Sequence, residues 1–172
     1  MLVDVKMDHG PIIAQRKIDI PDWPPRGGDL DALLAREGGR LLAEIIPLWA
    51  RGEIEAHEQN HDVATYSKMF KKEDGLLDLE NGDPYQNLLK IRAFDCWPGT
   101  HAFFAPRSTD STDSPRASSG QDGEKRVRVK ILDAHLENGP STKLGVNKLI
   151  IDVVKPEGKK EMPFADFQRS ML

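Results

Sequence analysis

Residues 125–134 read KRVRVKILDA, a stretch in which basic and apolar side chains alternate. Successive side chains of a β-strand point to opposite faces, so this spacing predicts a strand over 127–134. One face of the strand would present Arg126, Arg128 and Lys130, and the other would place valine and isoleucine side chains in a core. A row of cations suits a phosphate backbone, but it also keeps an exposed strand soluble, so both interpretations stay open.

Other short segments surround this strand and predict a mixed α+β fold. Apolar or alternating runs at 76–79, 100–104 and 149–154 predict strands, with 143–146 as a further candidate, and 84–94 predicts a helix. Short strands separated by turn residues favour a small antiparallel β-barrel or sandwich over a parallel sheet.

The domain organisation follows from these patterns and from composition. We expect a C-terminal barrel domain at 73–172, with a flexible insertion at 106–125 that holds five serines and only one apolar residue, Ala117. Residues 56–72 are polar and are interpreted as a linker. Residues 1–55 contain two short strand-like runs around a turn, expected to form a hairpin, and then a helical pattern.

A long helix is expected in the second part of that N-terminal region. Large apolar side chains recur at helical spacing over 30–49, and Asp29 is a candidate N-cap. The glycine pair at 38–39 and Pro47 disfavour a helix interior, so a kink or two separate pieces is expected.

The composition excludes several classes of protein. The 172 residues are 38% apolar, and no apolar run approaches the roughly 18 residues that a membrane span needs. The first residues show no secretory signal pattern. A single cysteine, Cys96, excludes an internal disulfide framework, and the five histidines lack the spacing of metal ligands. We therefore expect a cytoplasmic protein without a metal site.

The distribution of charge leaves a polyanionic partner open. The net charge of −4 is carried by residues 1–60, which hold 7 basic and 11 acidic side chains, while the remainder is neutral overall. Phosphate contacts depend on local basic patches and not on the total charge.

Three segments together resemble one protein family. Residues 66–75 (YSKMFKKEDG), 91–99 (IRAFDCWPG) and 156–162 (PEGKKEM) occur with the order and spacing of segments in methionyl-tRNA formyltransferases, although the second has Asp-Cys where the family has Asn-Pro. The resemblance covers about residues 60–172. It implies a C-terminal OB-like antiparallel β-barrel that holds initiator methionyl-tRNA.

The N-terminal region also resembles formyltransferases. The stretch MDHGPII at 7–13 is similar to the loop that carries their essential aspartate, and Asp8 is the one position here that matches a catalytic residue of the family. The resemblance implies that 1–55 is the C-terminal remnant of a doubly wound formyl-transfer domain. The asparagine and histidine of the family's Asn-x-His segment have no counterpart in this sequence.

The resemblance implies a transferase that formylates initiator methionyl-tRNA in translation initiation, with 10-formyltetrahydrofolate as co-substrate. Formyl transfer to an amine needs a proton relay and donors to the tetrahedral oxyanion. Asp8 alone does not supply both, so we expect the chain to be inactive by itself and to bind no cofactor by itself. A separate catalytic half is one expected partner.

The resemblance and the local clusters of positive charge together give nine candidate tRNA-binding residues. For each of them a solvated surface or a structural ion pair is the alternative, and for Arg92 a carboxylate such as Asp95 is a candidate partner. Trp97 and Phe94 are expected in the barrel core. The nine candidates are Lys68, Lys71, Lys72, Arg92, Arg126, Arg128, Lys130, Lys159 and Lys160.

Three functions remain open from the sequence. The chain is a part of a methionyl-tRNA formyltransferase that binds tRNA, or a stand-alone RNA-binding or protein-interaction module without catalysis. A part of an amino-sugar-nucleotide formyltransferase is a weaker alternative, because the lysine-rich segments favour tRNA. Open strand edges in the N-terminal remnant would also favour a homodimer.

Overall fold

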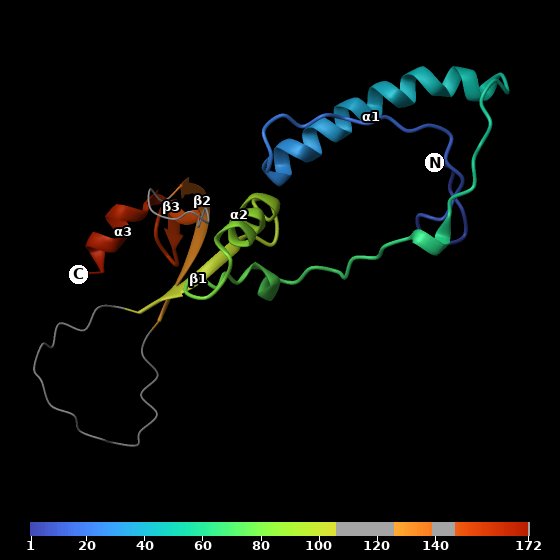
Figure 1. Cartoon of the computed structure of the whole chain (residues 1–172). Coiled ribbons are helices and arrows are strands. Elements are labelled where there is room, and N and C mark those ends of the chain that lie inside the picture. The colour runs from blue at the N-terminus through green and yellow to red at the C-terminus, as the bar shows by residue number, and fades with distance from the viewer. Residues whose placement is uncertain (106–125, 139–146, 172) are drawn as a thin grey trace, which may run out of the picture. The chain divides into compact units, whose positions relative to one another are not determined.

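The structure of this chain is a computed structural model, which describes residues 1–105, 126–138 and 147–171. Contacts divide the chain into two compact units, Met1–Met69 and Phe70–Leu172. Figure 1 shows the long helix α1 in the first unit and the labelled strands in the second. The expected insertion at 106–125 and the candidate strand at 143–146 lie outside the described residues.

The first unit is built around the helix α1, which runs over Gly27–Ala50. It is one continuous helix, so the prediction of two pieces is wrong. Pro47 lies within the last four residues of the helix, and the one backbone hydrogen bond that it cannot donate does not divide the helix. The N-cap is Arg26 and not Asp29, so the helix begins three residues earlier than expected. Asp29 lies in the first turn, where its carboxylate interacts favourably with the helix dipole.

The N-terminal hairpin expected in the same unit does not form. Ile12 instead exchanges two backbone hydrogen bonds, of 2.8 and 2.9 Å, with His57, as an isolated antiparallel bridge. The turn brings Gly10 so close to Leu2 that a Cβ atom on Gly10 would lie 1.9 Å from the Leu2 carbonyl oxygen. The backbone therefore passes very close to itself at this turn, and the Ile12–His57 bridge does not continue into a β-ladder.

The second unit contains an antiparallel sheet with the strand order β1-β2-β3-β4. In the described part of the chain, two 3₁₀ turns and two further α-helices accompany α1 and the strands. The strands are β1 (Thr100–Phe104), β2 (Val127–Asn138), β3 (Asn147–Pro156) and β4 (Met162–Pro163), the 3₁₀ turns are η1 (His61–Val63) and η2 (Lys72–Gly75), and the helices are α2 (Pro84–Ala93) and α3 (Phe164–Ser170).

The mixed α+β class is confirmed, while closure into a barrel is not. Strand 100–104 and the helix starting at Pro84 are confirmed, the latter with the Asp83 carboxylate accepting a 2.8 Å hydrogen bond from the Gln86 N–H. The predicted strand at 76–79 is reduced to a single parallel bridge between Leu76 and His101. The described strands form an open sheet with β1 and β4 at its edges, so the OB-like barrel remains a prediction.

The core of the second unit lies on one face of this sheet. Val129, Ile131 and Ala134 of β2 are at most 2% exposed, and they pack with Ile91 of α2 and Phe167 of α3. The predicted inward face of the KRVRVKI stretch is thus confirmed. Because side chains alternate along a strand, the opposite face of β2 carries its basic residues.

Within the described ranges, no helix combines the length and apolar character that crossing a membrane requires.

Candidate functional site

A hollow of about 210 Å³ lies over β2, β3 and the turn that follows β3. Most of its charged lining is positive. The described residues that line it are Arg128, Lys130, Lys155, Pro156, Glu157, Gly158 and Lys159. We refer to its four cations, Arg128, Lys130, Lys155 and Lys159, as the cationic cluster.

Strand pairing and one turn assemble the cationic cluster. Lys130 pairs with Lys155 across the β2–β3 ladder, so both side chains share one face. The turn after β3 needs a positive φ of 74° at Gly158, which a side chain would disfavour. This turn, closed by a 3.1 Å hydrogen bond from the Lys159 N–H to the Pro156 carbonyl oxygen, brings Lys159 back toward the strands.

The electrostatics of the hollow favour an anion. Its lining holds four cations against one carboxylate, that of Glu157. One further carboxylate, on Glu161, lies 3.6 Å from the Lys155 Nζ in an exposed ion pair, an arrangement that contributes little to stability. Like charges that share one face repel one another, and a polyanion would relieve this repulsion.

The neighbouring strand β1 adds an aromatic side chain to this face. In the β1–β2 register Phe103 lies opposite Arg128 and His101 lies opposite Lys130. The His101 and Phe103 rings meet edge to face, with centroids 5.8 Å apart. Burial, followed by the charge of Arg128, lowers the pKa of His101, while Glu73 opposes this shift. His101 therefore adds no positive charge near neutral pH.

Only some of the predicted tRNA-binding residues come together. Three of them, Arg128, Lys130 and Lys159, line the hollow, and the structure adds Lys155, which the sequence analysis missed. Lys155 follows an apolar run whose strand register the sequence does not reveal. The signal that could have identified it is strand alternation: Lys155 follows Val154 directly, so it points to the face opposite the buried Val154 side chain.

The other predicted cations lie elsewhere. Arg126 and Lys160 are exposed and next to the hollow in sequence, but they are not among the described residues that line it. Lys71 and Lys72 are exposed at the start of η2 in the second unit. Lys68 belongs to the first unit.

Arg92 has a structural contact. Its Nη1 atom lies 3.4 Å from the Asp133 Oδ1 atom, and its Nη2 donates to the Ala134 carbonyl oxygen at 3.5 Å. The Arg92 side chain is only 25% exposed and the Asp133 side chain 35%. The ion pair joins α2 to β2, which supports the structural interpretation of this residue.

The prediction that Trp97 and Phe94 lie in the core is corrected. Trp97 is 57% exposed and does not anchor the core, and Cys96 is exposed as well. Phe94 is half-buried, and its ring contacts that of Phe70 at 5.1 Å.

Asp8 lies in a different hollow, of about 900 Å³, within the first unit. The backbone of Asp8 has a positive φ of 58°, and its carbonyl oxygen accepts a 2.9 Å hydrogen bond from the Gln59 Nε2. Its neighbour His9 stacks on His61 with ring centroids 4.2 Å apart, and His57 also lines the hollow. The lining includes no lysine or arginine, but it holds two carboxylates (Asp8, Glu58), three imidazoles (His9, His57, His61) and three side-chain amides (Gln15, Gln59, Asn60).

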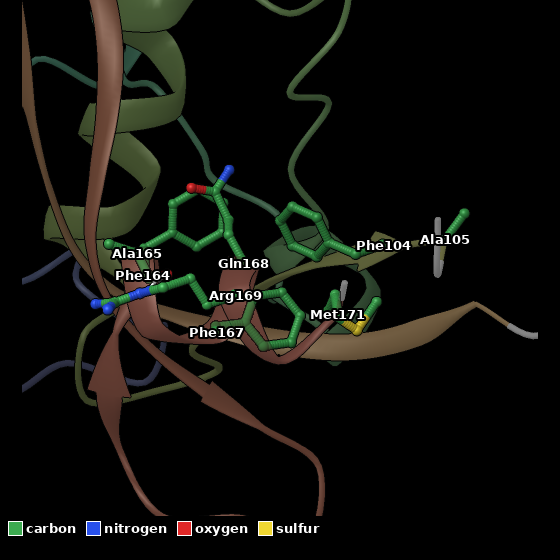
Figure 2. Close-up of a pocket in the computed structure, with 8 residues that line it drawn as sticks. All are labelled: Phe104, Ala105, Phe164, Ala165, Phe167, Gln168, Arg169 and Met171. Atoms are coloured by element: carbon green, nitrogen blue, oxygen red, sulfur yellow. Dashed lines mark hydrogen bonds between the residues drawn. The ribbon is translucent and has the colours of Figure 1, made fainter. Parts of the chain in front are cut away.

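A third hollow, of about 600 Å³, is apolar and lies where β1 ends beside α3. Figure 2 shows the rings of Phe104, Phe164 and Phe167 in it, together with the side chain of Met171. The guanidinium group of Arg169 is paired with Asp166. Its one ionisable lining residue is thus already in an ion pair. The aromatic side chains around the hollow pack α3 against the sheet.

The sheet also carries a histidine–aspartate pair, five residues after Lys130 on β2 and three residues before Lys155 on β3. The Nδ1 atom of His135 lies 2.8 Å from the Asp152 Oδ2 atom. This hydrogen bond raises the pKa of His135. Because the carboxylate balances the imidazolium charge, the pair adds no net positive charge. Among the residues that the structure describes, no group of three or more side chains is arranged to hold a metal ion.

Sequence comparison places this chain among the formyltransferases. Methionyl-tRNA formyltransferase from Chloroflexus aurantiacus is 40% identical over 148 residues, covering 80% of this chain and 47% of that protein. The enzyme of the same name from Roseiflexus castenholzii is 32% identical over 185 residues, covering 99% of this chain and 53% of the relative. The one from Geobacter sulfurreducens is 29% identical and covers 97% of this chain.

No family model matches the chain. The relatives nevertheless share one name and match most of the length of this chain, so the resemblance to the methionyl-tRNA formyltransferase family stated above is confirmed. The chain spans about half the length of the curated relatives it matches.

Proposed function

We propose that the cationic cluster binds the phosphate backbone of tRNA, and that this chain thereby contributes the tRNA-holding part of methionyl-tRNA formylation. The observation that carries the proposal is the convergence of four cations on one hollow, in a chain similar to methionyl-tRNA formyltransferases. The remaining predicted cations of the second unit, Lys71, Lys72, Arg126 and Lys160, would extend the contact, and RNA binding by Lys68 stays a separate prediction. The proposed setting is translation initiation in the cytoplasm, with initiator methionyl-tRNA as the partner.

Salt dependence tests this proposal directly. Each phosphate neutralised by a lysine or arginine releases a counterion, so four contacts give a slope of about −3 to −4 in log affinity against log salt concentration. We expect the affinity for tRNA to fall about 100-fold between roughly 50 and 200 mM salt. A fluorescence anisotropy titration measures this slope. Absent binding at the lower salt concentration, or a slope near zero, contradicts the proposal.

Catalysis by this chain is a separate proposal. Asp8 is the residue that the family resemblance assigns to formyl transfer, and the asparagine and histidine of the family's Asn-x-His segment have no counterpart in this sequence. A positioned acid or base contributes about 10²–10⁴-fold, and an oxyanion donor about 10²–10³-fold. We expect no formyl-methionyl-tRNA from 10-formyltetrahydrofolate with this chain alone. Turnover that Asp8→Asn abolishes would show instead that the hollow is a complete active site.

The alternatives differ in what they predict for RNA. A stand-alone RNA-binding module would bind tRNA with the same salt dependence but would not stimulate formylation when the Asn-x-His half of a relative is added. A protein-interaction module or an amino-sugar-nucleotide formyltransferase would show no salt-dependent affinity for tRNA. A separate catalytic half and a homodimer through the first unit remain compatible with the proposed function.

A further inference from the structure

We propose that Phe103 is a stacking platform for an unpaired base of the RNA whose phosphates the cationic cluster holds. This inference rests on the proposed function. It adds the class of RNA that the site prefers, namely one with unpaired nucleotides at the contact and not a continuous duplex.

The strand register places Phe103 on the same face as the cations. Phe103 lies opposite Arg128, and His101 lies opposite Lys130, which in turn lies opposite Lys155. Directly opposed residues of an antiparallel pair have Cβ atoms about 5 Å apart on one face. An aromatic ring and a guanidinium group therefore stand side by side at the edge of the cationic cluster.

The exposure of Phe103 sets it apart from its neighbours in β1. Its side chain is 49% exposed, whereas Ala102 is 3% exposed and the ring of Phe104 packs against α3. A single exposed apolar residue is ordinary on a protein surface. Here, however, the ring adjoins a row of cations, and its edge contact with His101 restricts its orientation.

A nucleotide carries both of the groups that this surface suits. Its phosphate matches the lysine and arginine side chains, and the face of its base matches an aromatic ring. A base inside a duplex is already stacked on both sides, so an exposed ring stacks best on an unpaired base. Loss of one such stacking partner weakens binding by a factor of about 5 to 150.

The test titrates the whole chain with two labelled RNA probes by fluorescence anisotropy. One probe is a single strand of about 12 nucleotides, within the range that one small nucleic-acid-binding domain covers, and the other is a blunt duplex of matching length. We expect Phe103→Ala to weaken single-strand binding about 10-fold or more and duplex binding less than about 2-fold. Phe103→Trp should retain the single-strand affinity, because it keeps an aromatic face.

Two further variants separate stacking from other effects. Phe103→Leu keeps an apolar side chain without an aromatic face, so it should lose the same single-strand affinity as the alanine variant while leaving the fold intact. Tyr85→Ala removes another exposed aromatic side chain, 38% exposed on α2, and should leave both affinities unchanged.

The outcomes distinguish this inference from the proposed function. Unchanged single-strand binding by Phe103→Ala, or equal losses on both probes, overturns stacking and leaves tRNA binding by the cationic cluster standing. Failure of the unaltered chain to bind either RNA overturns both proposals together.

Discussion

Replacing Arg128, Lys130 and Lys155 together by alanine is expected to weaken tRNA binding about 100-fold at low salt. Each lost phosphate contact should also reduce the slope of log affinity against log salt by about 1, and so by about 3 in the triple variant. The loss should be nearly uniform across RNA sequences, since phosphate contacts carry no sequence information. Fluorescence anisotropy with initiator and elongator tRNA measures both quantities.

The triple variant should remain folded, which keeps the binding result interpretable. Lys130 and Lys155 are exposed, and Arg128 is half-buried on the face opposite the core. The Lys155–Glu161 ion pair has side chains 46% and 61% exposed, and such surface pairs contribute about 0–1 kcal/mol. Removing three neighbouring positive charges also relieves repulsion among them, so the free energy of unfolding should change little.

A charge-matched control separates a local site from the effect of total charge. Arg36, Arg40 and Lys148 are exposed and lie outside the hollow, the first two on α1 beside Glu37. Their joint replacement by alanine removes the same formal charge. We expect this control to change the tRNA affinity less than about 3-fold, because none of the three residues lines the hollow and salt screens the interactions of exposed charges. Equal losses in the two triple variants would show that the cationic cluster is not a specific site.

The sequence predicted which β2 residues lie on the cationic face, but it did not predict that Lys155 of β3 lies beside them. Alternation over KRVRVKI separates Arg128 and Lys130 from Val129 and Ile131 because the period of a strand is fixed by backbone geometry. Lys155 joins them only through the β2–β3 register, which includes shifts next to Asp133. Register depends on tertiary packing, so a pattern within one segment does not reveal it.

The errors in the N-terminal region have a similar cause. Two short apolar runs separated by a turn predicted a hairpin, but Ile12 pairs with His57, which is far along the chain. The Leu2 N–H donates a 2.9 Å hydrogen bond to the Pro11 carbonyl oxygen, but Pro11 has no N–H with which to continue a ladder. The positive φ of Asp8 and the crossing at Gly10 then direct the chain away from a ladder.

The C-terminal motif that carried the family resemblance has two structural roles. Gly158 provides the turn that returns Lys159 to the hollow, and Met162 pairs with Val154 as part of β4. The next residues form α3, which is too short for a helical pattern to be detected in the sequence. One segment therefore both supplies a cation to the cluster and closes one end of the core.

Phe167→Ala is expected to destabilise the second unit by about 3–5 kcal/mol, the usual range for truncating a buried phenylalanine. Phe167 is 2% exposed, and its ring centroid lies 5.5 Å from that of Phe104 and 6.1 Å from that of Phe164. Figure 2 shows the three rings together beside α3. The helix α3 has only seven residues, and helices of that length are not stable without tertiary packing. Loss of this ring should therefore release α3 from the sheet.

Urea unfolding followed through the methyl NMR signals of Val129 and Val154 measures this loss, because both residues are fully buried in the second unit. The midpoint should fall with little change in the slope of the transition. Phe103→Ala is the matched control: it removes the same ring from a 49% exposed site and should cost less than about 1 kcal/mol. If the two variants are destabilised equally, the contact between Phe167 and Phe104 does not hold α3 against the core.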